Sequence, residues 1–116
     1  MEVKVLVCGS RDFSDYSTMY EVLSGFSSAR IIAGACRGAD KIAVAIAKEL
    51  GFSYCEYPAN WQKYGRLAGP VRNWHILQTE CPDVVIAFPL GVSSGTWDMV
   101  KKARSEGVAV RVIESN

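Results

Sequence analysis

The sequence has few of the side chains that metal centres, disulfide frameworks and acid–base catalysts use. It holds one histidine, His75, and four cysteines, Cys8, Cys36, Cys55 and Cys81. The cysteines are widely spaced and form no C-x-x-C pair, so their spacing argues against a structural zinc site. We therefore expect reduced thiols, no metal and no cofactor, and the scarcity of general acids and bases favours binding over catalysis.

The chain also lacks an excess of charge and a long apolar run. Its 13 basic and 12 acidic residues give a formal net charge of +1, so strong nonspecific attraction to nucleic acid is not expected. No apolar run approaches the roughly 20 residues of a membrane-spanning helix. The first residues lead into a strand pattern rather than a secretory signal. We expect a cytoplasmic protein with neither a membrane nor a nucleic acid as its partner.

Alternating strand and helix patterns are the main feature that is present. A chain of 116 residues, 49% of them apolar, is typical of one domain, here 1–116. Strands are expected at 3–8, 30–33, 52–57, 83–88 and 108–113, and helices at 16–24, 39–50, 69–81 and 96–106; residues 59–68 show no clear period. This alternation predicts an α/β fold, a Rossmann-like three-layer α/β/α arrangement with a five-stranded, mostly parallel sheet.

Three of the expected strands end in turns rich in glycine, hydroxyl and arginine side chains. The turns hold Gly9, Ser10 and Arg11 after the first strand, Gly34, Arg37, Gly38 and Asp40 after the second, and Gly91, Ser94, Gly95 and Thr96 after the fourth. The carboxyl ends of parallel strands share one edge of the sheet, where open α/β folds bind ligands. Glycine permits close approach of backbone N–H groups to an anion, and a following helix N-terminus favours negative charge. We therefore predict a site for a nucleotide-type small molecule at this edge.

Several polar residues of these segments allow two interpretations. Arg11 is either a phosphate ligand or half of a solvated ion pair with the next residue, and Asp40 either complements a helix dipole or contacts a ribose. Asp98 either caps the last helix or faces a sugar. Arg72, which Asn73 follows, is expected in the first turn of the third helix, where a cation is unfavourable and a bound anion would offset that cost.

The aromatic residues also leave alternatives open. Trp61 and Tyr64 either stack on a base or belong to the core or to an interface. Trp74 and Trp97 lie on expected helix faces, which fits contact between subunits. We expect a homo-oligomer, a dimer or higher.

The turn residues resemble the YspA-like branch of the SLOG superfamily, a group of Rossmann-like domains. The matching segments are 9–12 (GSRD), 34–40 (GACRGAD), 61–73 (WQKYGRLAGPVRN) and 87–96 (AFPLGVSSGT). The third segment is the most specific, and the four together extend over most of the chain in the expected order. The resemblance implies that a nucleotide or nucleotide-derived ligand, such as an ADP-ribose-like metabolite or a nucleoside monophosphate, binds over these loops, so that the domain acts as a sensor or processing domain.

Two relatives supply alternative functions. The LOG group hydrolyses the N-glycosidic bond of nucleoside 5′-monophosphates with an arginine upstream of a Pro-Gly-Gly-x-Gly-Thr-x-x-Glu loop, and Arg72 matches that arginine by position. The loop departs here, because Leu90 replaces a glycine and Met99 stands where the glutamate is expected; Asp98 is the nearest carboxylate. If the chain is an enzyme, the resemblance implies catalytic roles for Arg72 and Asp98. DprA, which binds single-stranded DNA, makes a DNA-processing accessory role a lesser alternative.

Overall fold

Five parallel strands form the middle layer of the fold. The computed structural model describes residues 2–114, and the strand order is β3-β2-β1-β4-β5. The strands are β1 (Val3–Gly9), β2 (Ala29–Gly34), β3 (Ser53–Tyr57), β4 (Val84–Phe88) and β5 (Ala109–Val112). The helices are α1 (Tyr16–Leu23), α2 (Ala39–Leu50), α3 (Trp61–Tyr64), α4 (Ala68–Glu80) and α5 (Ser94–Ser105), with a 3₁₀ turn, η1 (Gly65–Leu67), between α3 and α4. The predicted Rossmann-like α/β class is confirmed, and every strand pairing within residues 2–114 is parallel.

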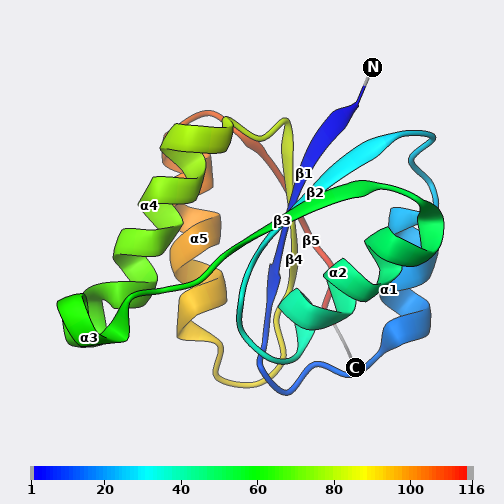
Figure 1. Cartoon of the computed structure of the whole chain (residues 1–116). Coiled ribbons are helices and arrows are strands. Elements are labelled where there is room, and N and C mark those ends of the chain that lie inside the picture. The colour runs from blue at the N-terminus through cyan, green and yellow to red at the C-terminus, as the bar shows by residue number, and fades with distance from the viewer. Residues whose placement is uncertain (1, 115–116) are drawn as a thin grey trace.

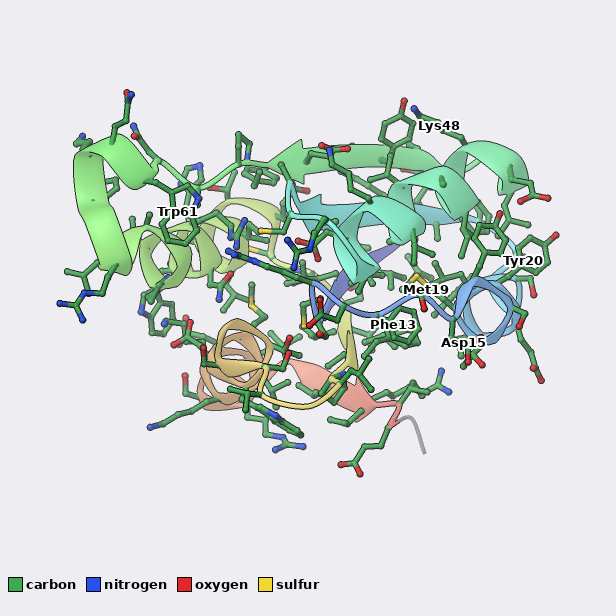
Figure 2. The ribbon with its side chains drawn as sticks, turned by 90° about the horizontal axis from the view of Figure 1, so that it is seen from below. Phe13, Asp15, Met19, Tyr20, Lys48 and Trp61 are labelled. Atoms are coloured by element: carbon green, nitrogen blue, oxygen red, sulfur yellow. The ribbon has the colours of Figure 1, made fainter. Side chains whose placement is uncertain are left out.

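Helices cover both faces of the sheet, as Figure 1 shows with α1 and α2 on one side and α4 and α5 on the other. Alternate residues of each strand point to opposite faces. Val5 and Val7 of β1 therefore join the core under α1 and α2, together with Phe13 and Met19, whereas Leu6 joins the core under α4 and α5. The labelled Phe13 and Met19 lie next to each other beside α1 in Figure 2.

The chain reverses its winding direction between β1 and β4. It adds β2 and then β3 on one side of β1, and after α4 it returns to place β4 on the other side. The register of these two strands runs from Val5 opposite Val84 to Gly9 opposite Phe88. A reversal of this kind opens a crevice beyond the carboxyl ends of the two strands, and ligands bind there in doubly wound folds.

A buried carboxylate ties α4 to the sheet. Glu80, near the end of α4, accepts hydrogen bonds from Arg30 Nε at 3.1 Å and from the Tyr57 hydroxyl. The ion pair with Arg30 is the largest of the causes that lower the Glu80 pKa to about 2. The same carboxylate raises the pKa of Tyr57 to about 12. These bonds join β2, β3 and α4 on the face opposite α1 and α2.

The structure differs from the expected elements mainly in residues 59–68. These residues form α3 and η1, in which the Asn60 side chain accepts from the Lys63 N–H at 3.0 Å and Gly65 ends the helix with a φ of +55°. As a result α4 begins at Ala68, one residue earlier than expected. In the part of the chain from residue 2 to residue 114, no helix is long and apolar enough to cross a membrane.

Candidate functional site

A cavity of about 640 Å³ lies at the carboxyl end of β1 and is lined by the loops after β1 and β2 and by α4 and α5. Figure 2 looks onto this edge of the sheet from below. Most residues that the sequence singles out line the cavity: Gly9, Ser10, Arg11, Gly34, Arg37, Asp40, Arg72, Asn73, Ser94, Gly95, Thr96 and Asp98. Gly38 and Gly91 are not part of its lining, and their assignment as ligand contacts stays a prediction. The topology therefore gathers segments that are far apart in the chain.

Two glycines allow the loops around the cavity to pack closely. Gly38 has a φ of +80°, and a Cβ added there would lie 2.4 Å from the carbonyl oxygen of Ser10. This close approach lets the Ala39 N–H donate to the same oxygen at 3.1 Å. A Cβ on Gly34 would lie 2.4 Å from Arg72 Nη1 and 2.8 Å from an Asp40 oxygen. Gly38 thus seats the start of α2 against the loop after β1, and Gly34 leaves room for two charged side chains.

Hydrogen bonds hold Arg72 in place from two directions. Its Nη1 donates to the Tyr57 carbonyl oxygen at 3.0 Å, and its Nε donates to Asn73 Oδ1 at 3.1 Å. Because α4 begins at Ala68, Arg72 opens the second turn, so the expected position in the first turn is wrong. The unfavourable interaction of this cation with the positive end of the helix dipole is therefore weaker than it would be in the first turn.

Asp98 lines the cavity, but its oxygens are bound by one lysine and one asparagine amide of the protein. Both of its oxygens accept from Lys102 Nζ at 2.6 Å, one turn further along α5. Asn73 Nδ2 donates to it at 2.9 Å and also reaches the Gly95 carbonyl oxygen at 3.4 Å. Since α5 begins at Ser94, Asp98 lies beyond the first turn and does not cap the helix.

Asp40 is the buried carboxylate of the site. The residue is only 6% exposed, and desolvation raises its pKa to about 6, against the opposing effects of Arg72 and of the hydrogen bond from the Cys36 backbone. Burial likewise raises the pKa of the Cys8 thiol, with Asp40 as a second cause. Cys8 is therefore a neutral thiol on the cavity wall rather than a nucleophilic thiolate.

The first turn of α5 presents free backbone donors to the cavity. Ser93 is the N-cap residue, but its hydroxyl bonds to the Thr96 hydroxyl at 2.6 Å instead of capping the backbone. Within residues 2–114, the N–H groups of Ser94, Gly95 and Thr96 have no protein acceptor. Unsatisfied N–H groups and the positive end of the helix dipole attract an anion at this position.

The mouth of the cavity carries further cations. The Arg11 guanidinium lies 5.8 Å from the centre of the Trp61 ring, which reaches across from α3 toward the loop after β1 (Figure 2). Arg37 pairs with Asp12 at 3.3 Å in an exposed contact. Among the described residues, no carboxylate forms an ion pair with Arg11, Arg66 or Arg72.

Arg66 and Cys36 line the cavity although the sequence does not single them out as ligand contacts, and Trp61, whose role the sequence leaves open, lines it as well. Arg66 lies within the segment 61–73, whose position over the cavity follows from α3 and η1, and those elements have no clear period in the sequence. The available signal was the arginine pair at 66 and 72 on either side of a Gly-Pro step.

Comparison with known proteins decides the family. A model described as "YspA, cpYpsA-related SLOG family" matches residues 3–64. The Gene 61 protein of Mycobacterium phage D29 is 32% identical over 117 residues, which cover 92% of this chain and 93% of that protein. The chain belongs to the YspA, cpYpsA-related SLOG family. The part of the chain that the family model matches includes the loops after β1 and β2 and ends before Arg72.

A solved structure supports the fold of the SLOG domain. DNA processing protein A (DprA) from Streptococcus pneumoniae superposes with a TM-score of 0.83 at 22% sequence identity. The similarity covers 99% of this chain and 51% of the DprA chain, so the SLOG domain spans about half the length of that protein. At this level of identity the comparison establishes a shared Rossmann-like architecture.

Proposed function

We propose that this SLOG domain binds a nucleotide or nucleotide-derived ligand in the cavity at the carboxyl end of β1, as a sensor or processing domain. One observation carries the proposal: three arginines without carboxylate partners and the free N–H groups of α5 converge on one cavity. The cavity volume of about 640 Å³ lies in the range of small-molecule sites. An anionic ligand with an aromatic or sugar part fits this combination.

The parts of the ligand follow from the chemistry of the walls. A phosphate is placed at the first turn of α5, where Ser94, Gly95 and Thr96 offer backbone donors and the Asp98 charge is already matched by Lys102. A base is placed at the mouth, where Trp61 and Arg11 offer stacking and cation–π contact. The sugar of the proposed ligand then lies inside the cavity, between the phosphate and the base.

Isothermal titration with AMP, GMP and ADP-ribose tests the proposal. We expect the wild-type protein to bind at least one of them. Arg72→Ala should weaken binding by about 1.5–3 kcal/mol, since it removes a charge-assisted hydrogen bond, and Arg11→Ala by about 0.5–2 kcal/mol, since it removes a cation–π contact with the base. Arg104→Ala is the matched control, because Arg104 is exposed on α5 and does not line the cavity. Equal affinity in all three variants would show that the arginines do not contact the ligand.

The two alternative functions, hydrolysis of a nucleoside monophosphate and DNA processing, have less structural support. Hydrolysis of a nucleoside monophosphate would need a carboxylate at the anomeric carbon, and Asp98 is held instead by Lys102 and Asn73. A DNA-processing role has the DprA fold in its favour, but the net charge of +1 gives little attraction to a polyanion. A single-stranded oligonucleotide added to the same titration panel separates DNA binding from nucleotide binding.

We also propose that α4 and α5 provide a surface for a second copy of the chain. Trp74 and Trp97, on neighbouring packed helices, remain 40% and 41% exposed. Large aromatic side chains are enriched in interfaces, and neighbouring exposed apolar side chains mark interaction surfaces more often than single ones do. The surface lies beside the cavity, because Asp98 follows Trp97 directly in α5 and Asn73 precedes Trp74 in α4.

A further inference from the structure

We propose that Asp40 and Arg72 form a subsite for the ribose hydroxyls, so that the domain selects ribonucleotides over deoxyribonucleotides. This inference rests on the proposed nucleotide binding and specifies which nucleotides are bound. A carboxylate accepts from a hydroxyl, and a guanidinium donates to it, so one hydroxyl satisfies both groups. The two side chains come from α2 and α4 and face each other across Gly34.

The Asp40 carboxylate and the Arg72 guanidinium are separated by a distance that one oxygen atom can bridge with two hydrogen bonds. Arg72 Nη1 and an Asp40 oxygen lie 2.4 Å and 2.8 Å from the same point, the position of a Cβ on Gly34. They are therefore close together, yet they form no direct ion pair within 4.0 Å. A bridging oxygen atom with ordinary hydrogen-bond lengths fits such a gap.

Asp40 has unused acceptor capacity at the wall of the cavity. An ionised carboxylate offers about four lone-pair sites, and the Cys36 backbone is the only donor assigned to Asp40 among the described residues. The residue is 94% buried and still lines the cavity. A buried carboxylate that is left without donors is costly, whereas a ligand hydroxyl relieves that cost.

Arg72 is oriented to serve the same ligand group. The Tyr57 carbonyl oxygen accepts from one of the two Nη1 N–H groups and Asn73 Oδ1 accepts from the Nε N–H, and the two bonds fix the plane of the guanidinium. A guanidinium has five N–H donors, so further donors remain for a ligand. A phosphate at this position would face the Asp40 carboxylate, whereas the first turn of α5 offers donors without that repulsion.

The test compares ligands that differ by one hydroxyl. Isothermal titration of the wild-type protein with AMP, 2′-deoxy-AMP and 3′-deoxy-AMP requires no variant. We expect AMP to bind roughly 10–100-fold more tightly than at least one deoxy analogue, the range that follows from losing a hydrogen bond to a charged group. In Asp40→Asn this preference should shrink to within about threefold, with the affinity for the deoxy analogue nearly unchanged. Asp12→Asn is the matched control, since Asp12 also lines the cavity but is paired with Arg37 at its exposed rim.

The outcomes separate the inference from the proposed function. Equal binding of AMP and both deoxy analogues by the wild-type protein overturns the ribose subsite and leaves nucleotide binding in place. A preference for AMP that persists in Asp40→Asn, with circular dichroism confirming the fold, also overturns it. Failure of AMP, GMP and ADP-ribose all to bind overturns the proposed function, and the subsite with it.

Discussion

At the scale of single residues, the carboxylates around the cavity differ in what neutralises them. Asp12 pairs with Arg37, and Asp98 pairs with Lys102. Asp40 is buried beside Arg72 without a direct ion pair. The identity of a carboxylate in the sequence therefore says little about its role, because the role depends on the donors that the fold brings to it. This difference leads us to assign ligand contact to Asp40 rather than to Asp98.

The role of Asp98 can be checked directly. If the domain only binds nucleotides, incubation with AMP or GMP releases no free base over hours, and Asp98→Asn changes affinity at most. The physical reason is that Lys102 and Asn73 already occupy its oxygens. Chromatography of the reaction mixture measures the free base. Adenine above the level without enzyme, and lost in Asp98→Asn, would instead identify a phosphoribohydrolase in which charge stabilisation acts in the transition state.

Glu80 provides a pH-dependent prediction for stability. Its pKa falls from 4.5 to about 2 on folding, chiefly through Arg30. A lowered carboxyl pKa stabilises the folded state above the unfolded pKa and is lost as the pH falls toward the folded one. We expect Glu80→Gln to lower the free energy of unfolding by about 3 kcal/mol at pH 7, with the difference from wild type shrinking between pH 4.5 and pH 2.

Urea unfolding at several pH values measures this difference. Glu21→Gln is a suitable control, since Glu21 is exposed on α1 and its carboxylate has no hydrogen bond among the described residues. If the Glu80→Gln variant is as stable as the control at pH 7, the desolvation penalty of the buried carboxylate equals the stabilisation from its ion pair and hydrogen bonds, which contradicts the prediction.

At the scale of elements, the start of α2 depends on a close approach that only glycine permits. Gly38 and Gly51 flank the same helix, with φ of +80° and +74°, but a Cβ would meet the Ser10 carbonyl oxygen at 2.4 Å at Gly38 and nothing within 4 Å at Gly51. We expect Gly51→Ala to cost about 1 kcal/mol for its backbone conformation alone. Gly38→Ala should cost roughly 3 kcal/mol, because a clash is added to that strain.

Thermal and urea unfolding of both variants check this prediction. Similar losses in the two variants would show that the loop after β1 moves away from α2 without cost. In that case Ser10 and Arg11 would not be held at the cavity by the start of α2.

The sequence allows the regular elements to be predicted better than the irregular ones. Apolar periodicity predicts α2 with the bounds 39–50 that the structure shows, because one face of that helix packs on the sheet. The four-residue α3 has no buried residue and depends on the Asn60 cap and on Gly65. Such a short helix leaves no periodic signal, so the position of Arg66 and the start of α4 could not be read from the pattern.

At the scale of the whole molecule, the site follows from strand order rather than from any single motif. The sequence indicates which loops share the carboxyl edge, but it does not say that β4 lies next to β1. That neighbourhood brings the first turn of α5 opposite the loop after β1. The hydrogen bond from Asn73 to Asp98 could not be foreseen, since it is set by the packing of α4 against α5. The pair of Asp98 with Lys102 has the i,i+4 spacing within α5 that a sequence does show.

The exposed tryptophans give a prediction for assembly. We expect a dimer in solution, and we expect Trp74→Asp or Trp97→Asp to shift it toward the monomer, because a charge on an apolar interface is costly to desolvate. Sedimentation equilibrium measures the mass. Tyr54→Asp is a matched control, since Tyr54 is similarly exposed, at 42%, but lies on β3 away from α4 and α5. A wild-type protein that sediments as a monomer at high concentration would contradict the proposed surface.

The central claim is that a nucleotide phosphate binds at the first turn of α5, and an amide NMR titration tests it most directly. On addition of AMP or ADP-ribose to the nitrogen-15-labelled protein, the amide signals of Ser94, Gly95 and Thr96 should shift saturably, together with that of Arg11. The amides of Lys48 and Gly51, at the far end of α2, should stay in place. Unchanged spectra at millimolar nucleotide, or shifts confined to residues outside the cavity, would contradict the account.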